Sequence, residues 1–153
     1  MSFMQSLDIS ATALTAQRLR MDIISNNLAN VNTTRTEKGG AYRRQMPVFV
    51  ERPGELSFRQ VLQKTLGGQE EQEDLLGRGV RVTEIIEDQT PLKMVYNPDH
   101  PDANKDGYVA MPNVNTVMEM VDMISATRAY EASVTAVNSA KSMAMKALEI
   151  GRG

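Results

Sequence analysis

The sequence has no cysteine and no tryptophan, and aromatic residues make up only 5% of its 153 residues. The lack of cysteine excludes disulfides, thiolate metal sites and thiol nucleophiles. The apolar fraction of 41% is below the ~45–50% usual for globular domains, so the chain can build one thin core at most. Apolar residues gather in roughly the first 30 and the last 40 positions. We therefore expect burial to be concentrated at the two ends of the chain.

The sequence also lacks an excess of one charge and long apolar runs. Its 17 basic and 19 acidic residues nearly cancel, and no Lys/Arg block is long enough to indicate nucleic acid or anionic lipid. Asp8 interrupts the apolar positions of the N-terminus, which recur with helical spacing, unlike those of a signal peptide. No segment approaches the ~18 consecutive apolar residues of a membrane span. We expect no nucleic-acid partner, no direct membrane insertion and no Sec-type export.

Near the N-terminus, apolar residues return every seven positions. They are Leu7, Leu14, Met21 and Leu28, with Ala11 and Ile24 at intermediate positions and Arg18 as an interruption. This heptad pattern predicts a coiled-coil helix over residues 1–32, ended by an Asn-rich tail. Such a helix is roughly 45 Å long at ~1.5 Å per residue, which exceeds what a small core on one chain can bury.

A second long helix is predicted at the C-terminus, over residues 113–153. Thr116 and Glu119 have the spacing of a capping box, in which both side chains satisfy free backbone donors at a helix start. The apolar stripe that follows is Val117, Val121, Ile124, Tyr130, Val134 and Val137. This stripe drifts around the helix, which favours more than one partner. Many alanine and serine residues permit close helix approach.

The middle region, residues 33–112, has short β-branched or alternating segments bounded by Gly, Pro or Asp. These predict strands over 42–50, 80–86 and 92–96. A short amphipathic helix is predicted over 58–66, followed by a mobile acidic linker over 67–74. The predicted fold class is mainly α with a small β element, in which the long terminal helices form an antiparallel coiled-coil-like hairpin. We expect one functional domain in all.

Residues capable of catalysis are scarce. His100 is the only histidine and lies between prolines in a predicted turn, without a second histidine or a cysteine to complete a nucleophile or zinc site. The glycine pairs match neither the dinucleotide-binding nor the P-loop pattern. No carboxylate pair with the spacing of an active site follows from the sequence. We therefore expect no enzymatic activity, no cofactor and no small-molecule substrate.

A weak metal-binding possibility lies in the segment 102–107. Asp102, Asn104 and Asp106 stand at alternate positions before Gly107, as in the first half of a calcium loop. The twelfth position is Asn113, where such a loop needs a bidentate glutamate. The alternative is a turn in which Asx side chains bond their own backbone. We expect no metal, with this segment as the one weak candidate.

Two motifs resemble those of a known family. The run Asn26-Asn27-Leu28-Ala29-Asn30-Val31-Asn32-Thr33 resembles the N-terminal signature of the bacterial flagellar rod and hook protein family. Pro112-Asn113-Val114-Asn115, Glu119–Ile124 and Arg128–Ala132 resemble its C-terminal signature. Both signatures stand at the correct ends and in the correct order. The turn 97–103 and the short middle region are most similar to the proximal-rod branch.

This resemblance implies a structural subunit of the flagellar basal-body rod, in the periplasm, needed for motility. It implies type III export without a cleaved signal peptide, and assembly with itself, other rod proteins and adjoining ring and export-gate components. The terminal helices would then form the subunit interface of a hollow drive shaft. The expected interface residues are Leu7, Leu14, Met21, Ile24, Leu28, Asn30, Val117, Val121, Ile124, Tyr130, Val134 and Val137.

Two competing hypotheses remain open on the residues alone. A pair of long apolar-striped helices also suits a cytosolic coiled-coil adaptor that never leaves the cell. An autolysin-like enzyme is the third possibility, and no carboxylate pair in the sequence supports it.

Overall fold

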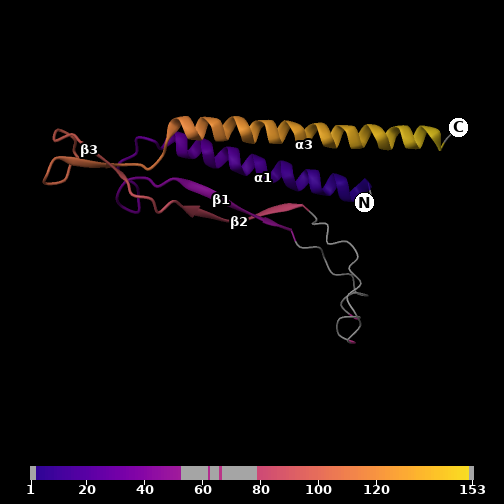
Figure 1. The fold of residues 1–153 in the computed structure, drawn as a ribbon, viewed down its shortest axis with the longest axis horizontal. Helices are drawn as coiled ribbons and strands as arrows, with labels where there is room; N and C mark the ends of the chain where they lie inside the picture. The colour runs from indigo at the N-terminus through magenta and orange to yellow at the C-terminus, as the bar shows by residue number, and fades with distance from the viewer. Residues whose placement is uncertain (1–2, 53–61, 63–65, 67–78, 152–153) are drawn as a thin grey trace.

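Two long antiparallel helices dominate the fold (Figure 1). The structure is a computed structural model that describes residues 3–52, 62, 66 and 79–151. Helix α1 spans Phe3–Ala29 and helix α3 spans Thr116–Ile150. Between them in sequence lie β1 (Gln45–Glu51), β2 (Val80–Glu87), β3 (Lys93–Tyr96) and β4 (Tyr108–Met111). The predicted helical hairpin with a small β element is confirmed.

Helix α1 is covered on two sides, because α3 packs on one side and the β1–β2 hairpin on the other (Figure 1). Ile24, a predicted seam residue, is buried, and so are Ala16 and Ile23. The predicted heptad seam did not include Ala16 and Ile23. A heptad pattern describes one covered face of a helix, whereas α1 is covered on two sides. No helix in the described ranges is long and apolar enough to cross a membrane.

The covered side of α3 has alternating four- and three-residue spacing. It comprises Glu119, Met123, Ala126, Tyr130, Ser133, Val137, Ala140 and Ala144, none of which is exposed. Several of these side chains are small, which allows the two helices to approach closely. Val117, Val121 and Ile124 lie outside this row and are exposed. The predicted stripe thus combines residues from two different faces of α3.

The start of α3 differs from the predicted capping box. Asn115 is the N-cap, and its side-chain oxygen accepts from the backbone N–H groups of Val117 (3.0 Å) and Met118 (3.3 Å). The cap therefore lies one residue before Thr116, and the capping-box prediction was wrong. Glu119 is buried and bonds to other parts of the chain, so its carboxylate is not available to the helix start.

The strands form two separate antiparallel pairs. In the first, Gln45 pairs with Glu87 and Glu51 with Val80, and a bulge leaves Thr83 as the extra residue. In the second, Lys93 pairs with Met111 and Tyr96 with Tyr108. The predicted strands are confirmed within a few residues, but β4 was not predicted. Its four residues show no alternation of apolar and polar side chains, so the period-two signal is absent.

The open end of the β1–β2 hairpin is closed by backbone and side-chain contacts. The Arg52 N–H donates to the Gly79 carbonyl at 2.9 Å. Thr12 of α1 accepts the Val80 N–H at 3.2 Å, and Gly79 has a positive φ of +103° directly against Thr12. Residues 52 and 79 are therefore held together and against α1. The predicted helix 58–66 and linker 67–74 lie outside the described residues, apart from positions 62 and 66.

Candidate subunit interface

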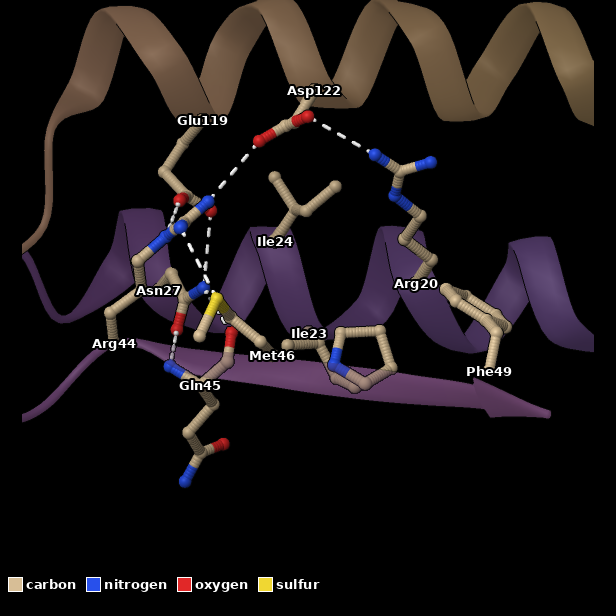
Figure 2. Close-up of a pocket in the computed structure, with 11 residues that line it drawn as sticks. Arg20, Ile23, Ile24, Asn27, Arg44, Gln45, Met46, Phe49, Glu119 and Asp122 are labelled. Carbon is tan, nitrogen blue, oxygen red and sulfur yellow. Dashed lines mark hydrogen bonds and ion pairs between the residues drawn. The ribbon is translucent and has the colours of Figure 1, made fainter. Parts of the chain in front are cut away.

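The end of α1, the start of β1 and the start of α3 meet at one cluster of polar side chains. We call this cluster the polar joint, and it comprises Asn27, Tyr42, Arg44, Glu119 and Asp122. Figure 2 shows four of them, with Asn27 on α1, Arg44 before β1, and both carboxylates on α3. The joint fixes how α1 and α3 face each other. It thereby determines which residues of the two helices stay exposed on the surface of the folded chain.

Asn27 is the centre of the joint and is only 1% exposed. Its Nδ2 donates to Glu119 Oε2 at 3.1 Å and to the Gln45 carbonyl at 2.9 Å. Its Oδ1 accepts from the Gln45 N–H and from the Tyr42 hydroxyl, both at 2.9 Å. All four hydrogen-bonding positions of this amide are thus used. One side chain connects α1, β1 and α3.

Glu119 is fully buried, at 0% exposed, and its charge is balanced within the joint. Its Oε1 accepts a hydrogen bond from Arg44 Nε in an ion pair. Arg44 also reaches Asp122 at 3.2 Å, and Asp122 accepts from Arg20 at 3.1 Å. A buried carboxylate is tolerated only when it is paired and hydrogen-bonded. The alternating charges of Glu119, Arg44, Asp122 and Arg20 meet that condition.

Tyr42 contributes a neutral hydroxyl to the joint. Burial of the side chain raises its pKa above the usual 10.0, and the negative charges of Glu119 and Glu87 raise it further. The phenol therefore remains protonated and donates to Asn27 Oδ1. The Tyr42 hydroxyl therefore donates this hydrogen bond throughout the physiological pH range.

Asn113 connects the joint to the segment before β3. Its Oδ1 accepts the Arg44 N–H at 2.8 Å, and its Nδ2 donates to Thr90 Oγ1 at 2.8 Å and to the Asp88 carbonyl at 3.1 Å. Hydrogen bonds from Thr90 in turn lower the pKa of the Asp88 carboxyl. Asn27 and Asn113 both lie in the motifs noted above, and the structure gives each a bridging role that spacing alone did not indicate.

A shallow pocket of about 330 Å³ opens beside the joint (Figure 2). The charged side chains along it, from Arg20, Arg44, Glu119 and Asp122, are hydrogen-bonded to one another. In the described part of the chain, no group of three or more His, Cys, Asp or Glu side chains could hold a metal ion. We interpret the pocket as the open side of the joint.

The segment 102–107 is organised by its own side chains. Asn104 Oδ1 accepts from the backbone N–H groups of Asp106 (3.0 Å) and Tyr108 (2.8 Å). Asp102 accepts from the Thr34 hydroxyl at 2.8 Å, and its N–H donates to His100 Nδ1 at 3.1 Å. Gly107 has a φ of +78°, a conformation that favours glycine. This geometry is the Asx-type turn considered above as the alternative to a calcium loop.

The predicted interface residues fall into two groups. One group is buried or half-buried within the fold and comprises Leu7, Leu14, Met21, Ile24, Asn30, Tyr130, Val134 and Val137. Asn30 donates to the Asn26 carbonyl at 2.9 Å and accepts from the Thr33 hydroxyl at 3.1 Å, which closes the end of α1. The other group is exposed and comprises Leu28, Val117, Val121 and Ile124.

The first turns of α3 carry one of two groups of exposed large apolar side chains on this helix, the other being Met143, Met145, Leu148 and Ile150 near its end. We call the first group the α3 patch, and it comprises Val117, Met120, Val121 and Ile124, each 50–66% exposed. At about 100° per residue, Val117, Val121 and Ile124 lie nearly opposite the buried Glu119, and Met120 lies about 100° from it. Exposed apolar side chains gathered in this way mark contact sites with other proteins. The patch is therefore the main candidate for contact with a neighbouring subunit.

Comparison with known proteins agrees with the signatures at both ends. Residues 7–35 match the family model described as "Flagella basal body rod protein", and residues 105–150 match "Flagellar basal body rod FlgEFG protein C-terminal". The chain is 49% identical to the flagellar basal-body rod protein FlgC of Bacillus subtilis, over 99% of this chain and 100% of that protein. It is 49% identical to FlgC of Borreliella burgdorferi over the full length of both. Identity to FlgC of Escherichia coli O157:H7 is 37%, over 99% of this chain and 100% of that protein.

Proposed function

This chain belongs to the FlgC family of flagellar basal-body rod proteins, and we propose that it builds the rod through the outer faces of its terminal helices. As a structural rod component it is not an enzyme, as the sequence predicted. Membership of this family also sets aside the cytosolic adaptor hypothesis. The proposal concerns which surfaces make the assembly, and the α3 patch is the observation that supports it most.

The α3 patch remains uncovered when the chain folds. Its four side chains are at least half exposed, although the opposite face of α3 is covered by α1. Burying one such side chain contributes about 1.5–3 kcal/mol. A contact in which this patch meets a different face of the next copy is heterologous, and heterologous contacts repeat to form rings or helical assemblies. This supports a ring-like or helical assembly whose wall contains the two helices.

Family membership gives a general statement about partners and location, and the more specific statements are our proposals. The family implies assembly with other flagellar rod components in the basal body. We further propose contacts with adjoining ring and export-gate components, a periplasmic position, and type III export without a cleaved signal peptide. The absence of cysteine supports this route, because an unfolded chain cannot then cross-link on arrival.

The proposal can be tested in a Bacillus subtilis strain that lacks its own FlgC. The chain should first be shown to restore swimming and intact basal bodies in that strain. The variant Val121→Asp places a charge in the α3 patch, where it costs little in the monomer but blocks apolar contact. We expect a soluble helical protein by circular dichroism, no swimming, and no rod in purified basal bodies.

A matched control places an acidic residue elsewhere on the surface. Lys105 is exposed in the 97–107 turn, outside both helices, and Lys105→Asp should leave swimming intact. Normal swimming by Val121→Asp would contradict the proposal that the α3 patch makes an assembly contact.

A further inference from the structure

The turn between β3 and β4 contains the only Asp–Gly or Asn–Gly pair in the sequence, Asp106–Gly107. Asp106 is exposed, and the β3–β4 hairpin lies at the end of the molecule remote from both termini (Figure 1). In an Asp–Gly pair, the side-chain carboxyl carbon can reach the next backbone nitrogen and close a five-membered ring. Glycine leaves that nitrogen unshielded, because it has no Cβ. The pair is therefore suited to a reaction between a side chain and the backbone.

The fold requires glycine at position 107. The φ of Gly107 is +78°, in the left-handed region that favours this residue. A Cβ added there would lie 2.9 Å from Tyr96 Cε2 and 3.4 Å from Pro98 Cβ. The Tyr96 ring is itself packed edge-to-face on Tyr108, with ring centroids 5.3 Å apart. A larger residue that would shield the nitrogen therefore does not fit, and the turn depends on the same residue that makes its backbone reactive.

Asn104 holds the reactive pair through its side chain and its backbone. Its Oδ1 accepts from the N–H groups of Asp106 at 3.0 Å and Tyr108 at 2.8 Å. Its carbonyl accepts the Gly107 N–H at 3.0 Å. The Gly107 nitrogen has to give up this bond and turn toward the Asp106 carboxyl before a ring can close. Asn104 therefore keeps the pair in an unreactive arrangement while the turn is closed.

The turn opens at a lower cost than the polar joint. The hydrogen bonds that Asn104 Oδ1 accepts are exposed to solvent, whereas Asn27 at the joint is buried. Segments with exposed backbone hydrogen bonds open locally while the rest of a protein stays folded. The reactive arrangement is thus reached from the folded chain, at a rate limited by opening of the turn.

We propose that Asp106 is a site of slow spontaneous conversion to isoaspartate, and that Asn104 limits the rate by holding the turn closed. The modification requires water alone and no enzyme or cofactor. It concerns the β3–β4 hairpin and does not depend on how the helices assemble.

The reaction consists of a ring closure and a ring opening. In the closure, the Gly107 nitrogen bonds to Asp106 Cγ, and the hydroxyl of the protonated carboxyl leaves with the Gly107 amide proton as one water molecule. In the opening, one water molecule attacks either carbonyl of the resulting succinimide. Attack at Cγ regenerates aspartate, whereas attack at the main-chain carbonyl carbon breaks its bond to the Gly107 nitrogen and gives isoaspartate. One water is released and one is consumed, so the final mass is unchanged.

Isoaspartate alters the turn, because the main chain then runs through Cβ and Cγ of residue 106. The backbone becomes longer by one carbon atom between the N–H groups of Asp106 and Tyr108, which share Asn104 Oδ1 as their acceptor. That one oxygen no longer suits both donors at their present distances. Tyr108 pairs with Tyr96 at the start of the hairpin, so we expect the modification to loosen this pair.

Ageing of the purified full chain tests the proposal. Asp-N protease cuts before aspartate and not before isoaspartate, so a peptide map reports the modification, and isoaspartyl methyltransferase labelling provides a second readout. We expect isoaspartate to accumulate at residue 106 over weeks at pH 5. Accumulation should be slower at pH 8, because fewer carboxyl groups are protonated there. In water enriched in oxygen-18, each ring opening should add one heavy oxygen atom to the peptide.

Variants of the turn separate the role of Asn104 from that of exposure. Asn104→Ala removes the acceptor of two hydrogen bonds and should raise the rate roughly tenfold or more. Asn104→Asp keeps an oxygen acceptor and should retain a rate close to that of the parent chain. The matched control is Lys105→Ala, at an exposed position of the same turn, which should leave the rate unchanged. Asp106→Glu should abolish the reaction, because glutamate would have to close a six-membered ring.

The urea-unfolded parent chain gives the rate of an unrestrained Asp106–Gly107 pair. A ratio of unfolded to folded rates near one would contradict the restraint by the turn, and this comparison needs no variant. Far-ultraviolet circular dichroism should show that the variants keep their helices. Equal rates for the parent and a folded Asn104→Ala would refute the role of Asn104. Isoaspartate that forms in urea, yet in neither the folded parent nor Asn104→Ala, would overturn the proposed site.

Discussion

The two ends of the helical hairpin are built on different principles. At the polar joint, Asn27 and Glu119 are almost completely buried and fully bonded within the chain. At the other end, where both termini lie (Figure 1), Leu148 and Ile150 of α3 are 66% and 82% exposed. One end completes its contacts alone. The other leaves large apolar side chains exposed within the described part of the chain.

Under the proposed function, this difference separates the residues that fix the fold from those available for assembly. Polar groups that must be satisfied together tolerate few alternative arrangements, so the joint favours a single alignment of α1 and α3. Exposed apolar side chains at the free end impose no such restriction. We expect substitutions at the joint to reduce the stability of the monomer, and substitutions at the free end to leave it nearly unchanged.

The largest effect is expected from Arg44→Met, which leaves the buried Glu119 without its cation. Removing one partner of a buried ion pair typically costs about 3–5 kcal/mol. Urea unfolding followed by circular dichroism measures this loss directly. The control is Arg43→Met, since Arg43 donates to the carbonyls of Asp88 (3.2 Å) and Thr90 (3.4 Å) at a more open position. Equal losses for the two variants would show that the joint is no more important than a surface contact.

A smaller loss is expected from Asn27→Ala, which leaves several buried partners unsatisfied. Each unsatisfied buried group costs about 1–3 kcal/mol, reduced where a water molecule can enter. The neighbour Asn26 provides a matched control, because it is exposed and, among the described residues, its side chain bonds only to Asn30. We expect Asn26→Ala to lose less than about 1 kcal/mol in the same unfolding experiment. A larger loss for Asn26→Ala would contradict the central role of Asn27.

The Tyr42 hydroxyl gives the joint a pH dependence. Because the pKa of Tyr42 is raised on folding, its stabilisation is fully present below about pH 10 and is lost as pH rises through the folded-state pKa. Tyr42→Phe should lose about 1 kcal/mol at neutral pH and show a shallower decline above pH 10. Tyr96→Phe, at an exposed ring, should retain the decline of the parent chain. Unfolding free energies measured from pH 8 to 11 would reveal whether the slopes differ.

The smallest effect is expected from Leu148→Asp at the free end. The side chain is largely exposed, so the free energy of unfolding should change by no more than about 0.5 kcal/mol. The same substitution at the half-buried Val137 should cost considerably more. If Leu148→Asp destabilised the monomer as strongly as Val137→Asp, the free end would be stabilised within one chain, and the comparison would fail.

Sequence periodicity predicted the elements well and the joint poorly. The heptad of α1 and the apolar stripe of α3 located both helices, because each signal lies within one continuous segment. The joint combines side chains separated by up to about 90 residues, so no local pattern contains it. Glu119 illustrates the limit: its spacing from Thr116 indicated a helix cap, whereas Arg44 and Asn27 provide better partners in the folded chain.

The outer faces were only partly predictable for a different reason. Val117, Val121 and Ile124 were correctly selected as apolar positions, but a helical pattern does not reveal which side another helix will cover. The buried Ala16 was missed because it lies on a second covered face of α1, outside the heptad. Which face of a helix is covered by other parts of the chain can be seen only from the three-dimensional arrangement of the helices and strands.

The closed base of the β1–β2 hairpin bears on how this chain could change in length. Residues 52 and 79 are neighbours in space, because the Arg52 N–H donates to the Gly79 carbonyl. Because these two residues lie together, an insertion between them need not separate the helices or disturb the joint. This point is therefore suited to accept an affinity tag or a foreign domain. It is also a position where relatives could acquire longer middle regions without altering the rest of the subunit.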